Sequence, residues 1–280
     1  MRQPSEFDLT LRSGTVHAQR FGPADAPLAL CVHGLSANMH AFDYLAERIA
    51  GEDRQVVAFD LRGRGRSEVT PLGSYGLAAH ARDVLEVATL VGADRFDLVG
   101  WSLGAMIGIT VASVAAERLR SITLIDHCKR EDAAAHTAVR QGLNRLDAVV
   151  DSPAEYLAAI RSAGLATPWS SYWERLYSYE LGPHDGRFSP VTDKAACVED
   201  LDSPDWDRVV PAWPKLTMPV LLIRATVGIR GGFVVTESDR DAIRLAVPTL
   251  RLVELDRNHF GVMTDDRSVD AIAKLLAEAV

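Results

Sequence analysis

Short apolar runs alternate with amphipathic stretches along most of the chain. Phe7–Leu11 and Thr15–Phe21 flank an Arg-Ser-Gly turn and predict a β-hairpin. Continuous apolar runs, which are typical of strands buried on both faces of a parallel sheet, follow at Leu28–Val32, Gln55–Phe59, Phe96–Val99, Ser121–Ile125, Pro219–Ile223 and Leu250–Leu255. Apolar residues at three- and four-residue spacing predict helices over Ala41–Ile49, Ala78–Leu90, Leu103–Ala115 and Val269–Val280. The alternation predicts an α/β fold with a mostly parallel, eight-stranded sheet flanked by helices.

One segment, from His127 to Lys215, has no strong strand signal. A structureless loop of that length is improbable in a compact domain, so we expect it to form helices of its own. We therefore predict a core made of residues 1–126 and 216–280, with residues 127–215 inserted as a helical cap. The segment is rich in aromatic residues, most of which we expect to form the cap's own core: Tyr156, Trp169, Tyr172, Trp173, Tyr177, Tyr179, Trp206 and Trp213.

Composition narrows the class of partner. The chain has 280 residues, 48% of them hydrophobic, and a formal net charge of −8. An acidic protein repels nucleic acid and anionic membranes, so we expect neither of them as a partner. The start of the chain has no apolar leader, and three widely spaced cysteines form no disulfide framework. These features predict a cytoplasmic protein. We further expect a small-molecule substrate and a monomer or homodimer.

The strongest chemical signal is Gly100-Trp101-Ser102-Leu103-Gly104, between a predicted strand and a predicted helix. This is the context of a G-x-S-x-G nucleophile elbow. The flanking glycines allow a tight turn, and the serine hydroxyl is placed at the helix N-terminus, where developing negative charge is stabilised. Ser102 is the predicted nucleophile, and a chance small-residue turn is the less favoured interpretation.

A serine hydroxyl needs a neighbouring base. His259 lies just after the last predicted strand and is the best candidate, with Phe260 beside it. His33 follows an earlier strand, and we favour a structural role for it as a brace of the loop His33-Gly34-Leu35-Ser36. The backbone N–H groups of Leu35 and Leu103 are the predicted oxyanion donors. Trp101, His33, Ser36 and Phe260 are the candidates for the substrate pocket, and no residues are assigned to a metal.

The acid of the expected triad is less obvious. It should orient the histidine, yet residues 224–232, after the Pro219–Ile223 strand, contain no carboxylate. Asp126 ends the preceding strand, and functional residues collect at the carboxyl ends of strands in such sheets. We therefore predict Asp126 as the acid. The alternative is that Asp126 only caps the entry to the insert and that Glu237 or Asp239 is the acid; these and Asp241 lie at a predicted helix start, where acids are common.

Together these residues resemble the α/β-hydrolase family. The order Ser102, Asp126, His259 is similar to that family's order of nucleophile, acid and base. Residues 60–67 resemble its D-x-R-G-x-G-x-S loop, which implies structural roles for Asp60 and Arg62. An acid after the sixth strand is similar to the subset that includes zearalenone lactone hydrolases and (E)-2-(acetamidomethylene)succinate hydrolase. The stretch of residues 33–38 is also similar to the latter.

The resemblance implies a serine hydrolase that cleaves a small-molecule carboxylic ester, lactone or amide through an acyl-enzyme, without a metal or organic cofactor. The same triad serves carbon–carbon bond hydrolases, perhydrolases or haloperoxidases, thioesterases and lyases, which product analysis would separate. A serine at position 102 excludes the family's dehalogenases and epoxide hydrolases, which use aspartate there. Some hormone receptors share the fold, so a non-catalytic ligand receptor is the alternative from another class.

Overall fold

The computed structural model describes residues 4–131, 133–229 and 232–279. Its main sheet has eight strands in the order β1-β2-β4-β3-β5-β6-β9-β10. β2 is antiparallel to β1 and β4, and all other neighbours are parallel. The strands are β1 Ser5–Leu11, β2 Gly14–Phe21, β3 Leu28–Val32, β4 Gln55–Phe59, β5 Phe96–Trp101, β6 Leu119–Ile125, β9 Val220–Ala225 and β10 Leu250–Leu255. The predicted mostly parallel, eight-stranded sheet is confirmed.

The helices of this part of the chain lie close to their predicted positions. They are α1 Asp43–Ile49, α2 Leu77–Leu90, α3 Leu103–Ala115, α9 Glu237–Ala246 and α10 Asp266–Glu278. The helix predicted over Ala41–Ile49 is divided, because a 3₁₀ turn, Met39–Phe42, precedes α1. The last helix begins earlier than predicted, with Asp265 as its N-cap. Val280, the final residue of that prediction, is outside the described residues.

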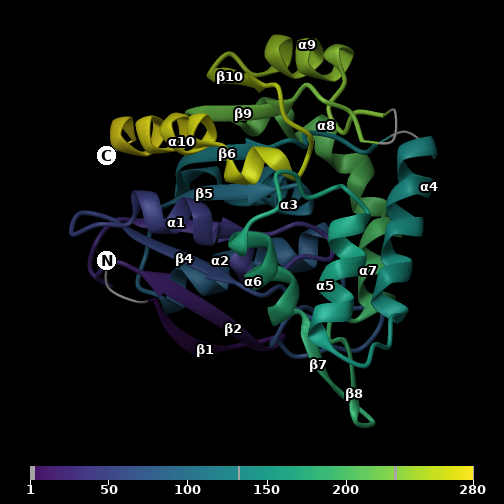
Figure 1. Ribbon diagram of the computed structural model, residues 1–280. Coiled ribbons are helices and arrows are strands. Elements are labelled where there is room, and N and C mark those ends of the chain that lie inside the picture. The colour runs from purple at the N-terminus through teal and green to yellow at the C-terminus, as the bar shows by residue number, and fades with distance from the viewer. Residues whose placement is uncertain (1–3, 132, 230–231, 280) are drawn as a thin grey trace.

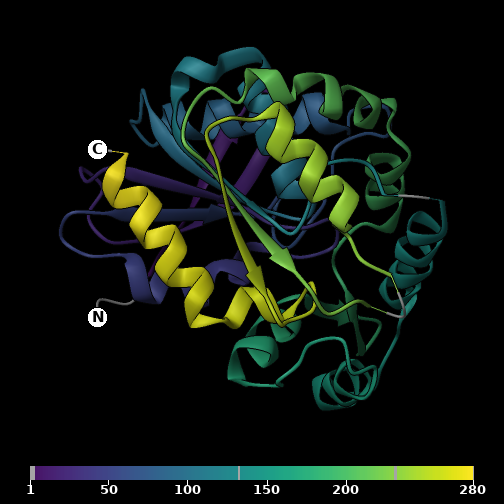
Figure 2. The same cartoon turned by 90° about the horizontal axis from the view of Figure 1, so that it is seen from above.

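Two hydrophobic clusters lie on opposite faces of the sheet. In β3, Leu28, Leu30 and Val32 pack in one cluster, while Ala29 and Cys31 pack in the other. Side chains of a strand alternate between faces, so a strand covered on both sides is apolar throughout, as the sequence shows. Helices α2, α3 and α9 cover one face and α1 and α10 the other, as the side view and the view from above both show (Figures 1 and 2).

Residues 127–215, called the insert below, join β6 to β9. They contain α4 Ala133–Gly142, α5 Pro153–Ser162, α6 Ser171–Tyr179, α7 Lys194–Asp202 and α8 Val209–Ala212, with 3₁₀ turns Leu143–Asp147, Pro204–Arg208 and Trp213–Lys215. Helices α4, α5 and α7 lie beside the sheet, on the side away from the N and C marks (Figure 1). Among the described residues, no helix has both the length and the apolar character that crossing a membrane requires.

The insert departs from the sequence analysis in two respects. It contains a β-hairpin, β7 Leu181–His184 and β8 Arg187–Pro190, where no strand signal was recognised. Its turn, Asp185-Gly186, has positive φ at both residues, the geometry for which Asp-Gly is favoured. In addition, Trp206 and Trp213 pack in the hydrophobic cluster on the face of the sheet that α2, α3 and α9 cover. These two aromatic residues therefore belong to the sheet's core.

Candidate active site

Ser102 lies on a sharp turn between β5 and α3. Its backbone has φ 55° and ψ −118°, a strained conformation for a residue with a side chain. The turn is tight because the chain segments around it touch. A Cβ on Gly100 would lie 2.3 Å from the Gly104 carbonyl oxygen, and one on Gly104 would lie 1.9 Å from the Val32 carbonyl oxygen. The two glycines therefore allow the close approach that the nucleophile-elbow motif predicts.

The structure brings Asp126 to His259. The Nδ1 atom of His259 lies 2.8 Å from Oδ2 of Asp126, and the other carboxylate oxygen accepts a hydrogen bond of 2.9 Å from the Ala225 N–H. Asp126 is only 1% exposed, and it directly follows β6 with a φ of 47°. The Trp101 indole N–H donates to the carbonyl oxygen of His259 at 3.2 Å. The ends of β5, β6 and β9, three neighbouring strands of the sheet, thus hold the histidine and the acid together.

The alternative acids lie elsewhere. Asp239 caps the N-terminus of α9 through Thr236 and forms an ion pair of 2.7 Å with Lys129. Asp241 pairs with Arg240 on the surface, and Glu237 is exposed in the first turn of α9. Of the residues 224–232 that lack a carboxylate, Arg230 and Gly231 are outside the described residues. Asp126 is therefore the carboxylate that the geometry offers to His259.

The loop after β3 lies against the nucleophile, because a Cβ on Gly34 would be 3.2 Å from Cβ of Ser102. Three consecutive carbonyl groups of this loop each accept a hydrogen bond from a side chain. Gly34 O accepts from His33 Nδ1 at 2.7 Å, Leu35 O from Arg64 Nε at 3.0 Å and Ser36 O from Arg145 Nη2 at 2.6 Å.

These bonds bear on the predicted oxyanion donors. In a trans peptide the N–H points away from the preceding carbonyl, so holding Gly34 O fixes the direction of the Leu35 N–H. The second predicted donor, Leu103, is the first residue of α3. Its N–H is one of those that have no acceptor within the helix.

His33 is a brace and not a pocket residue. It is fully buried, and its second ring nitrogen, Nε2, accepts a hydrogen bond of 3.0 Å from the Leu61 N–H. Burial lowers the pKa of His33 to about 3, although the bond to the Gly34 carbonyl acts in the opposite direction. The imidazole is neutral near pH 7, and neither nitrogen is left for a substrate. The structural role expected for His33 fits this placement, whereas the pocket assignment is corrected.

The other pocket candidates differ in their contacts. Phe260 is half-buried and packs edge-on against Trp101, with ring centroids 5.9 Å apart, and against Trp173 of the insert at 6.0 Å. Trp101 is buried, with its ring 5.4 Å from that of His259. The Ser36 hydroxyl accepts from Arg145 at 3.1 Å, so it is already bonded within the protein. The rings of Trp101 and Phe260 therefore both pack against that of His259.

Sequence reasoning missed two arginines beside the Leu35 loop, the half-buried Arg145 and the buried Arg64. Arg145 donates to Glu180 and to the Tyr156 hydroxyl as well as to Ser36. Arg64 donates to Asp200 at 2.5 Å and to Leu35. Arg64 falls within the D-x-R-G-x-G-x-S stretch, which could have drawn attention to it, whereas no local pattern singles out Arg145.

Comparison with known proteins shows which proteins this chain is similar to. The family model described as alpha/beta hydrolase fold matches residues 27–163. A 2-(acetamidomethylene)succinate hydrolase of Mesorhizobium japonicum is 28% identical over 200 residues, which cover 71% of this chain and 70% of the relative. A serine hydrolase-like protein of Danio rerio is 29% identical over 147 residues, 51% of this chain and 45% of that protein. The chain thus spans about half the length of some curated relatives that it matches.

Solved structures show the same fold. The crystal structure of an E-2-(acetamidomethylene)succinate hydrolase superposes with a TM-score of 0.87 at 22% identity, covering 98% of this chain and 100% of that chain. At such identity the likeness shows the fold. With its eight-stranded sheet and its serine turn between β5 and α3, the chain has the α/β-hydrolase fold, and it is similar in sequence to hydrolases.

Proposed function

We propose that this protein is a serine hydrolase that cleaves a small-molecule carboxylic ester, lactone or amide with Ser102, His259 and Asp126. The observation that carries the proposal is the hydrogen bond of 2.8 Å between His259 and Asp126, the residue after β6, which is the strand next to the one that precedes Ser102. A buried carboxylate on Nδ1 fixes the histidine tautomer that leaves Nε2 free to accept a proton.

The first half of the proposed reaction forms an acyl-enzyme. Ser102 Oγ attacks the substrate carbonyl carbon while His259 Nε2 takes the hydroxyl proton. The tetrahedral intermediate collapses, the bond to the leaving group breaks, and His259 returns the proton to that group. Asp126, held in place by the Ala225 N–H, stabilises the imidazolium in between.

In the second half, water attacks the acyl-enzyme. His259 accepts a proton from the water and then gives it to Ser102 Oγ, which releases the carboxylic acid. The negative oxygen of each intermediate accepts hydrogen bonds from the N–H groups of Leu35 and Leu103. The hold on the Gly34 carbonyl supports this role for Leu35, and the position of Leu103 at the start of α3 supports the second donor.

The surroundings of His259 and the relatives support this substrate class. Trp101 and Phe260 pack against His259, and Trp173 packs against Phe260, so the surroundings are aromatic and suit a substrate with an apolar part. The insert supplies Trp173 and is proposed to act as the cap of the site. The name of the Mesorhizobium relative describes hydrolysis of an acetamido compound, so amides belong in the search beside esters and lactones.

The proposal is tested by treating the purified protein with a fluorophosphonate probe and mapping the adduct by mass spectrometry. We expect labelling at Ser102, and we expect Ser102→Ala to lose the label together with about a thousandfold or more of any ester turnover. Turnover by folded Ser102→Ala at the wild-type rate would overturn the assignment. A wild type that neither reacts nor turns over esters, lactones or amides, yet retains a ligand tightly, would favour the receptor alternative.

A further inference from the structure

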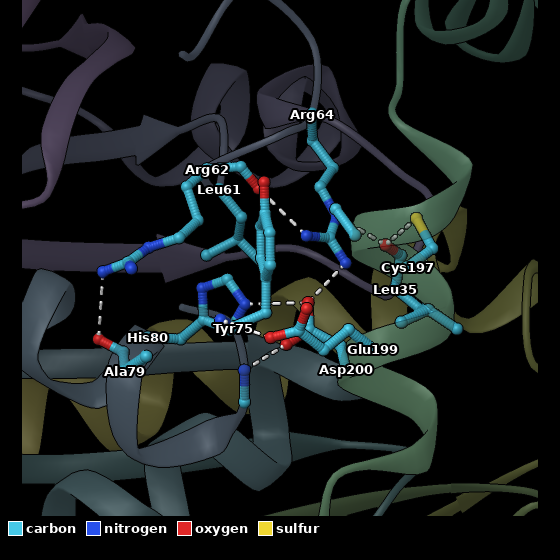
Figure 3. A network of polar contacts seen from close by, with 12 residues as sticks. Leu35, Leu61, Arg62, Arg64, Tyr75, Ala79, His80, Cys197, Glu199 and Asp200 are labelled. Atoms are coloured by element: carbon cyan, nitrogen blue, oxygen red, sulfur yellow. Dashed lines mark hydrogen bonds and ion pairs between the residues drawn. The ribbon is translucent and has the colours of Figure 1, made fainter. Parts of the chain in front are cut away.

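A fully buried ionic network connects the insert to the loop beside Ser102. Arg64, in the loop after β4, and Asp200, in α7 of the insert, have side chains that are 0% exposed. The Arg64 Nη2 atom lies 2.5 Å from Asp200 Oδ2, as Figure 3 shows with the residues around them. Because an unpaired charge is costly to bury, each of these two groups needs the other to remain in place.

Each of the three nitrogen atoms of the Arg64 guanidinium donates a hydrogen bond. Besides Asp200, it donates from Nε to the Leu35 carbonyl at 3.0 Å and from Nη1 to the Arg62 carbonyl at 2.9 Å. The guanidinium is planar, so its bonds to Asp200 and to the Arg62 carbonyl also fix the direction of the Arg64 Nε–H, which donates to the Leu35 carbonyl. The Leu35 carbonyl is therefore held on the side of the loop where Arg64 lies.

Asp200 is itself firmly placed. It accepts from the Gly76 N–H at 2.6 Å and pairs with His80 Nε2 at 2.9 Å. Burial alone would raise the pKa of Asp200, but the nearby His80 and Arg64 hold it well below its usual range. Helix α7 also reaches the loop directly, since Cys197 Sγ lies 3.4 Å from the Leu35 carbonyl oxygen. Helix α7 thus acts on the Leu35 carbonyl directly through Cys197 and indirectly through Asp200, which holds Arg64.

We propose that Arg64 is a positioning residue of the oxyanion hole and that Asp200 of the insert keeps it in position. The inference rests on the proposed function. The Leu35 carbonyl belongs to the peptide that follows the Leu35 N–H. Arg64 holds this peptide and His33 holds the one before it, so the two together fix the backbone on both sides of the Leu35 Cα and present the Leu35 N–H to the reacting oxygen. The insert is then part of the machinery that stabilises the intermediate, in addition to being a cover for the substrate.

Arg62 offers a matched comparison in the same loop. It also forms a buried pair, with Asp83, through two hydrogen bonds of 2.7 and 2.5 Å. Its remaining donors go to the Ser74 carbonyl at 2.8 Å and to the Ala79 carbonyl, not to residues 33–36. A lysine at either position keeps the charge and loses the planar fork. The two substitutions therefore impose a similar structural loss, and only one of them touches the Leu35 loop.

The test compares wild type, Arg64→Lys and Arg62→Lys with a p-nitrophenyl ester of a short acid. We expect Arg64→Lys to lower kcat about tenfold or more while KM changes less than about threefold. Binding of a trifluoromethyl ketone, whose adduct with serine carries an oxyanion, should weaken by about the same factor as kcat/KM. Arg62→Lys should lower the unfolding temperature comparably and change kcat by less than about threefold.

Equal kcat losses in the two variants, or folded Arg64→Lys with wild-type kcat and ketone affinity, would overturn the inference. If Arg64→Lys does not fold, Asp200→Asn takes its place, because this substitution removes the charge that holds Arg64 and keeps the shape of the side chain. An unchanged kcat in folded Asp200→Asn would then overturn the inference. A wild type with neither turnover nor fluorophosphonate labelling would overturn the proposed function as well, so the two failures are distinguishable.

Discussion

His259 Nδ1 lies 2.8 Å from Oδ2 of Asp126, a residue 133 positions earlier in the chain. The second carboxylate oxygen is bonded to the Ala225 N–H at the end of β9. The carboxylate is therefore fixed at both oxygens, and it can hold the imidazole ring in one orientation.

Replacing Asp126 with asparagine should remove activity while the fold is retained. The amide keeps the shape but favours the wrong histidine tautomer, so kcat should fall by about a thousandfold or more. Glu237→Gln is the control, because Glu237 is exposed on α9. Ester turnover and the rate of fluorophosphonate labelling are the measurements. Loss of labelling in Glu237→Gln, with normal labelling of Asp126→Asn, would transfer the acid to α9.

The turn at Ser102 should not accept a side chain at position 104. A Cβ there would lie 1.9 Å from the Val32 carbonyl oxygen, and backbone cannot move aside cheaply. We expect Gly104→Ala to lose about 3 kcal/mol or more of unfolding free energy, or to fail to fold. Gly142→Ala is the matched control, since no atom lies within 4 Å of the added methyl group, and it should be neutral or slightly stabilising. Urea denaturation of both variants measures the difference, and equal stability would contradict the close approach.

The buried neutral His33 predicts a loss of stability in mild acid. Its pKa falls from 6.5 to about 3 on burial, so the unfolded chain binds a proton in this range that the native protein does not. The contribution of His33 is complete above pH 6.5 and decreases at about 1.4 kcal/mol per pH unit as pH falls toward 3. Denaturation curves at pH 7, 6 and 5 should show a shallower decline for His33→Asn than for wild type. Parallel declines would indicate that His33 is protonated in the native protein.

The cysteines should be unreactive in the native state. Cys31, Cys128 and Cys197 are free and buried, and burial raises the pKa of the Cys128 thiol to about 12 and that of Cys31 still further. Because the thiolate is the reactive form, a disulfide reagent should titrate no thiol in folded protein and all three after unfolding in guanidinium. Fast modification of one native thiol with loss of turnover would show that a cysteine is accessible near the site.

Most of the sheet could be predicted because strands covered on both faces are apolar throughout, as in Leu28–Val32. Asp126 could also be predicted, since it ends the strand next to the serine-bearing one. The hairpin β7–β8 was missed because its strands are short and half exposed, although Asp185-Gly186 is a hairpin signal. The pairing of Arg64 with Asp200 spans 136 positions and depends on how the insert packs, so no local pattern contains it.

The backbone at Asp126 restricts how this position can diverge. Its φ of 47° lies in the left-handed region, where aspartate and asparagine are the common residues after glycine. The proposed chemistry independently requires a carboxylate. Asparagine satisfies only the first requirement and glutamate only the second, so aspartate is the residue on which both agree. In evolutionary terms, no single substitution at this position meets both requirements. The acid therefore stays an aspartate, or a carboxylate on another strand takes over its role.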